Sequence, residues 1–287
     1  MGTICRKEIR GYFTSMLGYV FIAFMLVISG IYFTAYHMQA GYPIFGYSLS
    51  SITFVFLIVT PVLTMRSLAE ERRAKTDQLL LTSPLSVWDI VGGKFLGLAG
   101  VFLISCLIMG IYPLIMSNYG TVNMAMSYAA LLGFFLLGCA NLSIGLFLSS
   151  LTESQILSAV LTFAVLFLCY MMNGIESLLG ETASTSLLAF ALIILAAAVL
   201  IAYVLKNTFL AVLVGIVGEA VLFVLYLARS SMFEGAIQKV LDVFNLTGHF
   251  DDFVNGVFSV SGVVYYLSVI GIFLFLTVQS IQKRRWS

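Results

Sequence analysis

Residues 49–116 decide the fold, because they place two apolar runs on either side of a charged segment. They read LSSITFVFLIVTPVLTM over 49–65, RSLAEERRAKTDQLLLTSPLSVWDIVGGK over 66–94 and FLGLAGVFLISCLIMGIYPLIM over 95–116. A helix needs about 20 predominantly apolar residues to cross the hydrocarbon core of a bilayer. The two runs are therefore predicted to be membrane spans, and residues 66–94 the polar connection between them.

The composition of the whole chain points the same way. Of 287 residues, 61% are hydrophobic and 9% are charged, whereas an ordinary globular domain has about 25% charged residues. The net charge of +1 gives no overall basic field and so no argument for nucleic-acid binding. The four cysteines are scattered without metal-ligand spacing. We expect an all-α polytopic membrane protein that binds no nucleic acid and no metal.

Six segments are long and apolar enough to be spans. They are residues 17–36, 49–65, 95–116, 126–149, 156–173 and 260–280. A seventh apolar region, 187–228, would be roughly 60 Å long as one helix, about twice the thickness of the membrane core. It is predicted to fold back at Lys206-Asn207 and to form two spans, which gives about eight in total.

The distribution of positive charge predicts the orientation. With eight crossings and both termini in the cytoplasm, all but Arg229 and Lys239 of the 14 lysines and arginines fall on the cytoplasmic side. This asymmetry is what the positive-inside rule requires. Treating 187–228 as a single span would move the basic tail 283–285 outside and spoil the agreement.

The charged segment 66–94 is predicted to form two helices separated by a turn. Glu71 and Lys75 stand four residues apart in the favourable helical order, so the second span is expected to continue as a helix to about Leu80. Pro84 lacks an N–H and interrupts it. Ser86, followed three residues later by an acid, is predicted to cap the next helix.

Two interpretations of this segment remain. Charged loops between spans are commonly no more than solvated connections. However, Leu79–Leu81 and Trp88 lie beside the charges, and an apolar patch with a charged rim is typical of a docking surface.

The segment resembles the connection between the second and third spans in permease subunits of ABC type-2 exporters, particularly the gliding-motility-like branch. The matching motifs are Glu70-Glu71-Arg72, Thr76-Asp77, Leu79 to Pro84, Asp89 and Gly93-Lys94. Lys75 stands where a glycine is usual, and Asp77 where glutamate is usual. Further similarity lies in 149–155, 249–253 and the last span with its basic tail. Residues 187–228 look like a two-span insertion relative to six-span permeases.

This resemblance implies a single transmembrane permease domain over 1–287 in the cell membrane. Residues 1–15 would be an amphipathic elbow helix whose Arg6, Lys7 and Arg10 face anionic lipid. Residues 66–94 would contain a coupling helix that contacts a separate ABC ATP-binding subunit. The contact residues would be Glu70, Glu71, Arg72, Lys75, Asp77, Leu79, Leu80, Pro84 and Asp89. A single coupling segment per chain calls for two ATPase copies and a second permease, identical or homologous.

No catalytic or cofactor-binding residue is predicted in this chain. It contains no G-x-x-x-x-G-K-[S/T] loop, no H-E-x-x-H and no G-x-S-x-G, so it lacks the P-loop that cradles ATP phosphates. The chain is predicted not to be an enzyme, with ATP and Mg²⁺ bound by the partner subunit.

Three further features leave alternatives open. Glu219 lies in the middle of an apolar stretch, where a charged carboxylate is energetically costly. It is either a coupling group, as in an ion- or proton-coupled secondary transporter, or a protonated side chain that is hydrogen-bonded to a neighbouring helix. Residues 230–258 are predicted to form extracellular amphipathic helices, which either cap the outer mouth of a translocation path or anchor on the outer leaflet. Gly93-x-x-x-Gly97 is a weak signal of close helix packing.

Overall fold

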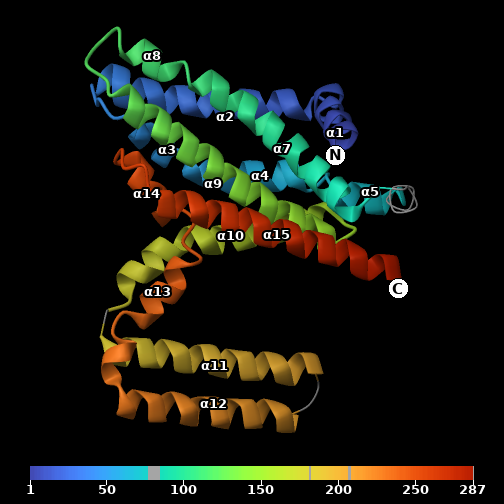
Figure 1. Cartoon of the computed structure of the whole chain (residues 1–287), viewed down its shortest axis with the longest axis vertical. Helices are drawn as coiled ribbons and strands as arrows, with labels where there is room; N and C mark the ends of the chain where they lie inside the picture. Colours follow the sequence, from blue (N-terminus) through green and yellow to red (C-terminus); the bar gives the residue numbers. More distant parts are fainter. Residues whose placement is uncertain (77–84, 181, 206–207, 287) are drawn as a thin grey trace. The chain divides into compact units, whose positions relative to one another are not determined.

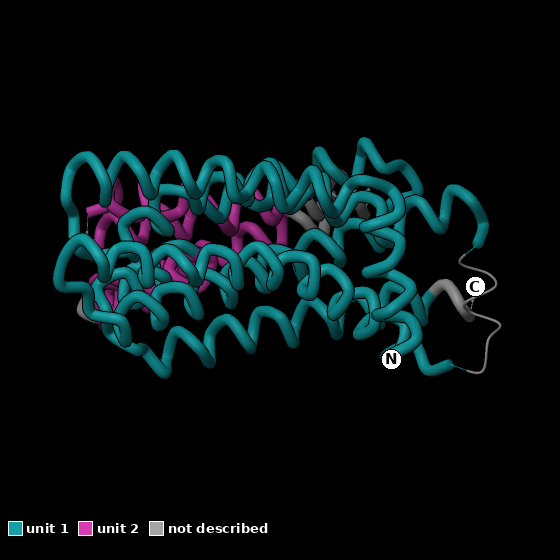
Figure 2. Tube along the Cα trace, turned by 90° about the horizontal axis from the view of Figure 1, so that it is seen from above, with its two compact units in different colours: residues 1–170, 247–287 teal, residues 171–246 magenta. Residues whose placement is uncertain are grey.

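The computed structural model describes residues 1–76, 85–180, 182–205 and 208–286, and these residues form helices without any strand. The chain divides into two compact units, coloured separately in Figure 2. Unit 1 comprises residues 1–170 and 247–287, and unit 2 comprises residues 171–246. Each unit is described by itself below.

Unit 1 is a helical bundle. Its elements are α1 (Gly2–Thr14), α2 (Leu17–Phe33), the π-helix η1 (Thr34–Gln39), α3 (Gly46–Ser51), the short 3₁₀ helix η2 (Thr53–Val55), α4 (Phe56–Thr64), α5 (Ala69–Arg73), α7 (Val87–Met109), α8 (Tyr112–Met116), α9 (Met124–Leu151), α14 (Gly248–Val254) and α15 (Val260–Trp286), shown in Figure 1. The chain leaves this unit within α10 (Gln155–Leu178).

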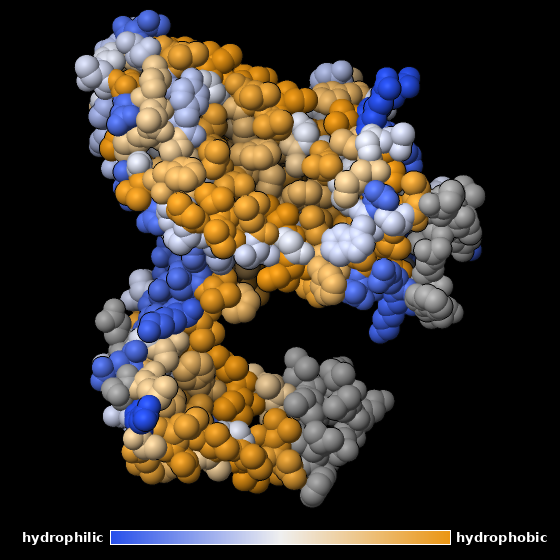
Figure 3. Space-filling model, in the orientation of Figure 1, coloured by the Kyte–Doolittle hydropathy of each residue, from blue (hydrophilic) through white to orange (hydrophobic). Residues whose placement is uncertain are grey.

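Six helical stretches among the described residues are long and apolar enough to cross a membrane. They are Leu17–Gln39, Gly46–Arg73, Val87–Met116, Met124–Leu151, Gln155–Leu178 and Val260–Lys283. The six predicted spans are confirmed in place, and with them the all-α polytopic class. On the face of unit 1 drawn in Figure 3, a broad apolar band separates hydrophilic ends. Such a band fits the hydrocarbon core of a bilayer, because soluble proteins rarely expose so large a continuous apolar surface to water.

Helix α9 forms the centre of unit 1 and packs against α15, α4, α7 and α14. Glycines on α9 allow close approach: a Cβ at Gly138 would lie 2.2 Å from the Phe102 ring, and one at Gly145 would lie 2.5 Å from Thr64 Oγ1. Phe102 in turn stacks on Phe135 with ring centroids 5.7 Å apart. The core is thus built from aromatic side chains seated over glycines, which brings the helices close together.

At one end of unit 1, the short helix α14 packs into the bundle. Phe253 is fully buried and fills the space over Gly133 of α9 and Gly262 of α15, where an added Cβ would lie 2.6 and 2.7 Å from its ring. Phe250 is also buried, whereas Val257 is exposed. Helix α14 thus closes this end of the bundle, and the two alternatives for 230–258 stay predictions.

Unit 2 contains an apolar hairpin of α11 (Ala183–Leu205) and α12 (Thr208–Ala228), followed by η3 (Ser230–Phe233) and α13 (Ala236–Asp242). Gly218 faces Ile194 and Gly215 faces Ala198, so the two helices run antiparallel. The proposed turn at Lys206-Asn207 lies outside the described residues. The apolar parts described, Ala183–Val199 and Val212–Ala228, are shorter than a full span, and the total of eight crossings stays a prediction.

Candidate functional site

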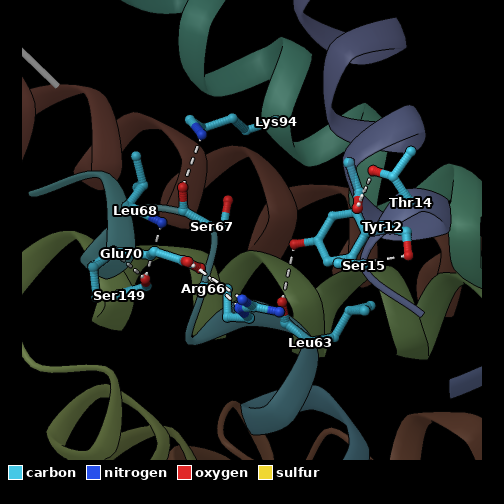
Figure 4. A network of polar contacts seen from close by, with 12 residues as sticks. Tyr12, Thr14, Ser15, Leu63, Arg66, Ser67, Leu68, Glu70, Lys94 and Ser149 are labelled. Carbon is cyan, nitrogen blue, oxygen red and sulfur yellow. Dashed lines mark hydrogen bonds and ion pairs between the residues drawn. The ribbon is translucent and has the colours of Figure 1, made fainter. Parts of the chain in front are cut away.

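A cluster of charged and polar side chains lies at the end of unit 1 opposite to α14, where α1, α5, the start of α7 and the end of α9 meet (Figure 1). Figure 4 shows part of it at close range, with Lys94, Ser67, Ser149 and the Arg66–Glu70 pair converging on the bend before α5. The cluster contains described residues of the predicted coupling segment together with side chains distant in sequence.

Lys94 is the centre of the cluster and is only 1% exposed. Its ammonium donates hydrogen bonds to Glu8 Oε1 on α1 and to the Ser67 carbonyl, both at 2.8 Å. It also lies 2.9 Å from Glu71 Oε2 on α5. That third contact is an ion pair without the directionality of a hydrogen bond. One buried ammonium thus joins α7 to α1, to α5 and to the bend between α4 and α5.

The charges around Lys94 balance. Glu8 and Glu71 are largely buried, with side chains 13% and 17% exposed, and two carboxylates against one ammonium would leave an excess negative charge. Lys7, on the exposed face of α1, supplies the second cation at 3.5 Å from Glu71 Oε1. Buried charges are tolerated when they are paired in this way.

Helix α1 reaches Lys94 because α7 presents glycines to it. A Cβ at Gly93 would lie 2.8 Å from Ile4 Cβ, and one at Gly97 would lie 2.6 Å from Glu8 Cβ. Real Cβ atoms essentially never approach this closely. The Gly93-x-x-x-Gly97 motif therefore has a definite role, which is to seat α1 against the start of the third span.

Helix α5 does not continue α4, and the prediction of one helix running to about Leu80 is wrong. Helix α4 ends at Thr64, and α5 runs only from Ala69 to Arg73. The Ser149 hydroxyl of α9 accepts hydrogen bonds from the backbone N–H groups of Leu68 (3.3 Å) and Ala69 (3.1 Å). These N–H groups at the start of α5 are thus satisfied by a side chain from another helix, as a local cap would satisfy them.

The C-terminus of α5 is a left-handed turn at Lys75, where φ is +55°. The Lys75 N–H bonds to the Arg72 carbonyl at 3.0 Å and the Thr76 N–H to the Glu71 carbonyl at 2.9 Å, which is the Schellman pattern. The predicted helical pair of Glu71 with Lys75 is absent, since the helix has ended and Glu71 faces Lys94. The glycine usual at position 75 in the resembling permeases suits this φ better than lysine.

A cleft of ≈ 250 Å³ opens between α1 and this bend, lined by Lys7, Gly11, Tyr12, Ser15 and Arg66 among others. The Tyr12 hydroxyl donates to the Leu63 carbonyl at 3.0 Å. Burial, assisted by the nearby Glu8 carboxylate, raises the pKa of the Tyr12 phenol, so it stays protonated and keeps this bond. The charged groups lining the cleft, three cations and three glutamates, give it no net preference for an anion.

The first residues of α7 carry the predicted cap. Ser86 precedes α7, and its Oγ accepts from the Asp89 N–H at 3.0 Å and donates to the Asp89 carboxylate. The prediction of an N-cap at Ser86 is confirmed. Trp88 next to it is half-exposed and contacts the Phe275 ring, 6.3 Å away between centroids.

Comparison with protein families decides the class of this molecule. Residues 28–178, more than half of the chain, match the ABC-2 family transporter protein model. The chain belongs to the ABC-2 transporter family. It is therefore a multi-pass membrane protein and a permease subunit of an ABC transporter, the partner of an ABC ATP-binding subunit and not itself the ATPase. Among curated proteins, none matches the chain. The gliding-motility-like branch stays a prediction.

The matched region includes the whole coupling segment, and the structure divides its predicted contact residues into three groups. Glu71 and Arg72 are turned inward, with Arg72 7% exposed. Glu70 pairs with Arg66 at 2.8 Å and remains partly exposed, Lys75 is exposed, and Asp89 lies at the start of α7. Asp77, Leu79, Leu80 and Pro84 lie outside the described residues.

Sequence reasoning omitted Lys94, Glu8 and Ser149 from the candidate residues. A signal was available for Lys94, because a lysine that opens a membrane span directly after two glycines is an intramembrane ionisable group that needs a partner. Glu8 is the single acid among the basic residues of α1. Nothing local distinguishes Ser149, whose role depends on where α9 ends.

Glu219 lies on α12 in unit 2 and is partly exposed. Among the residues that the structure describes, it makes no hydrogen bond or ion pair. The alternative of a carboxyl bonded to a neighbouring helix therefore gains no support. Among the described residues, no cation is paired with it either, and its role stays a prediction.

Proposed function

We propose that this ABC-2 permease is the membrane half of an exporter that is driven by ATP bound, with Mg²⁺, in a separate subunit. The exposed side of α5 and the residues that follow it would receive the ATPase on the cytoplasmic side. A pair of permeases, either two copies of this chain or one copy with a homologue, would engage two ATPase subunits and move a substrate across the cell membrane.

One observation carries the proposal: α5 is a short charged helix that is fixed on one side and exposed on the other. Its inner side is held by Lys94 and Ser149, while Arg73, Ala74, Lys75 and Thr76 are exposed. A lever needs a rigid attachment and an accessible surface, and α5 has both. The surface is charged, which suits a transient contact with a soluble subunit.

The cytoplasmic placement of this end is supported by charge. Helices α1 and α5 and the C-terminal end of α15 lie at one end of unit 1 (Figure 1), and their sequences are rich in lysine and arginine, in keeping with the positive-inside rule. Export as the direction, and the gliding-motility-like branch, rest on the motif resemblance in 66–94.

Co-purification with the ATP-binding subunit tests the proposal. The chain is expressed with its natural ATPase, extracted in detergent and isolated through a tag on the permease. We expect the ATPase to be retained, and Arg73→Glu to reduce that retention, because Arg73 is exposed on α5 and anchors no other part of the bundle.

The matched control is charge reversal at Asp252→Lys, an exposed residue of α14 at the opposite end of unit 1. It should leave retention of the ATPase unchanged. A wild-type chain that never retains the ATPase would remove the proposal. Equal retention by Arg73→Glu would remove α5 as the contact.

A further inference from the structure

The break between α4 and α5 raises the question of which spans follow a push on α5. Residues 65–68 separate the two helices, so force applied to α5 is not carried into α4 by a continuous helix. Helix α5 has a single turn of its own, and its attachments to the bundle are the side-chain contacts around it. One of these is the buried ion pair between Glu71 and Lys94, whose charged atoms lie 2.9 Å apart.

Lys94 distributes that attachment to two other helices. Its backbone belongs to α7, and its ammonium also holds Glu8 of α1. The glycine seat at Gly93 and Gly97 presses α1 against α7 along the same line. Glu71 of α5 is therefore connected through one side chain to the start of α7 and to α1.

The surroundings of the Lys94 ammonium also limit the partners that it can reach. An ammonium has three N–H donors, and Lys94 meets three oxygens within 2.9 Å. At 1% exposure, water does not replace a partner that is lost. Two hydrogen bonds and one ion pair thus hold the Lys94 ammonium in a buried site between α7, α1 and α5.

We propose that Lys94 is the positioning residue that transmits motion of the coupling helix α5 to α7 and to α1. It touches neither substrate nor nucleotide. The inference rests on the proposed function, because it takes the ATPase contact at α5 as given. It adds that α1 and α7 are moved by α5 through one buried cation.

The test compares Lys94→Met with Lys7→Met in the complete complex of permease and ATPase. Methionine keeps a long unbranched side chain and removes the charge. Lys7 is the matched control because it contacts the same carboxylate, Glu71, but from an exposed position at 3.5 Å. Two quantities are measured: the rate of ATP hydrolysis, and the ATP-dependent change in distance between spin labels at the far end of unit 1.

The labels are placed on exposed residues Ser117, after α8, and Asp252, on α14, in a background without the native cysteines. In the wild type, ATP with vanadate should shift the distance between them. In Lys94→Met the complex should still hydrolyse ATP at the wild-type rate, while the ratio of the shifted to the unshifted population falls by about 5- to 150-fold, the usual size of a coupling between sites. Lys7→Met removes an exposed contact at 3.5 Å, which contributes little, so most of the shifted population should remain.

Each outcome separates the two claims. A wild-type chain that binds no ATPase removes the proposed function, and this inference with it. A wild type that responds, together with a Lys94→Met variant that responds equally, removes the inference alone. A variant that loses hydrolysis and the distance change in equal proportion shows a merely structural lysine and also overturns it. Should Lys94→Met fail to assemble, Glu8→Met removes the acceptor on α1 and keeps a long unbranched side chain, and an unaltered distance change there overturns the transmission to α1.

Discussion

Substituting Gly97→Ala is expected to lift α1 from its seat on α7. The new Cβ would lie 2.6 Å from Glu8 Cβ, whereas ordinary van der Waals contact begins at 3.4 Å. The obstructing atom is the first carbon of the Glu8 side chain, so rotation of that side chain does not relieve the clash, and α1 must retreat by about 0.8 Å. A retreat of this size would lengthen the 2.8 Å hydrogen bond from Lys94 to Glu8 beyond hydrogen-bond range.

The magnitude follows from packing costs. Inserting a methyl group into a closely packed contact costs about 1–3 kcal/mol. Since each 1.4 kcal/mol is a factor of ten, opening of α1 should become about 5- to 150-fold more frequent. Alanine also has a better helix propensity than glycine by about 0.5–1 kcal/mol, but this gain belongs to α7 and does not hold α1 in place.

Hydrogen exchange in detergent, followed by mass spectrometry of peptides, measures the opening. Peptides from 2–14 should exchange faster in Gly97→Ala, while peptides from 95–109 should not. Gly11→Ala is the control, since nothing lies within 4 Å of its added Cβ, and it should leave α1 protected or slow its exchange. Wild-type exchange of α1 in Gly97→Ala would refute the glycine-seat argument.

Two predictions concern the ends of α5. Because Lys75 adopts a φ of +55°, Lys75→Gly should strengthen the turn by about 1 kcal/mol and Lys75→Val should weaken it. Hydrogen exchange of the Thr76 amide measures the stability of the turn. Equal exchange rates in both variants would contradict the left-handed turn. Ser149→Ala removes the acceptor of two buried N–H groups and should destabilise α5 by about 1–3 kcal/mol, measured by exchange of Leu68 and Ala69. Ser150→Ala is its control, because that hydroxyl is buried without a hydrogen-bond partner among the described residues; equal effects of the two variants would argue against the cap.

The predictions that succeeded depend on local chemistry. The six spans follow from runs of apolar side chains that only a bilayer accommodates. The Ser86 cap follows from a hydroxyl and an acid three residues apart, since both groups of this motif belong to one turn of chain. The motifs of 66–94 pointed to the permease family, which the match over 28–178 shows. None of these inferences needs knowledge of which helices become neighbours.

The prediction that failed depends on distant contacts. Glu71 and Lys75 have the spacing of a helical pair, and local propensity favours a helix through them. The pairing of Glu71 with Lys94 and the capping of Leu68 and Ala69 by Ser149 override that propensity. Lys94 and Ser149 lie 23 and 80 residues away from their partners Glu71 and Ala69. Contacts at such distances cannot be predicted from the residue pattern within the segment itself.

The sequence by itself determined that this protein lies in a membrane, where its six spans are and which family it resembles. Hydrophobicity and short motifs are properties of contiguous residues, so they can be recognised without the fold. Only the tertiary structure decided how the coupling segment is held. A buried ammonium requires carboxylates within 3 Å, and the folded bundle alone brings Glu8, Glu71 and Lys94 to that distance.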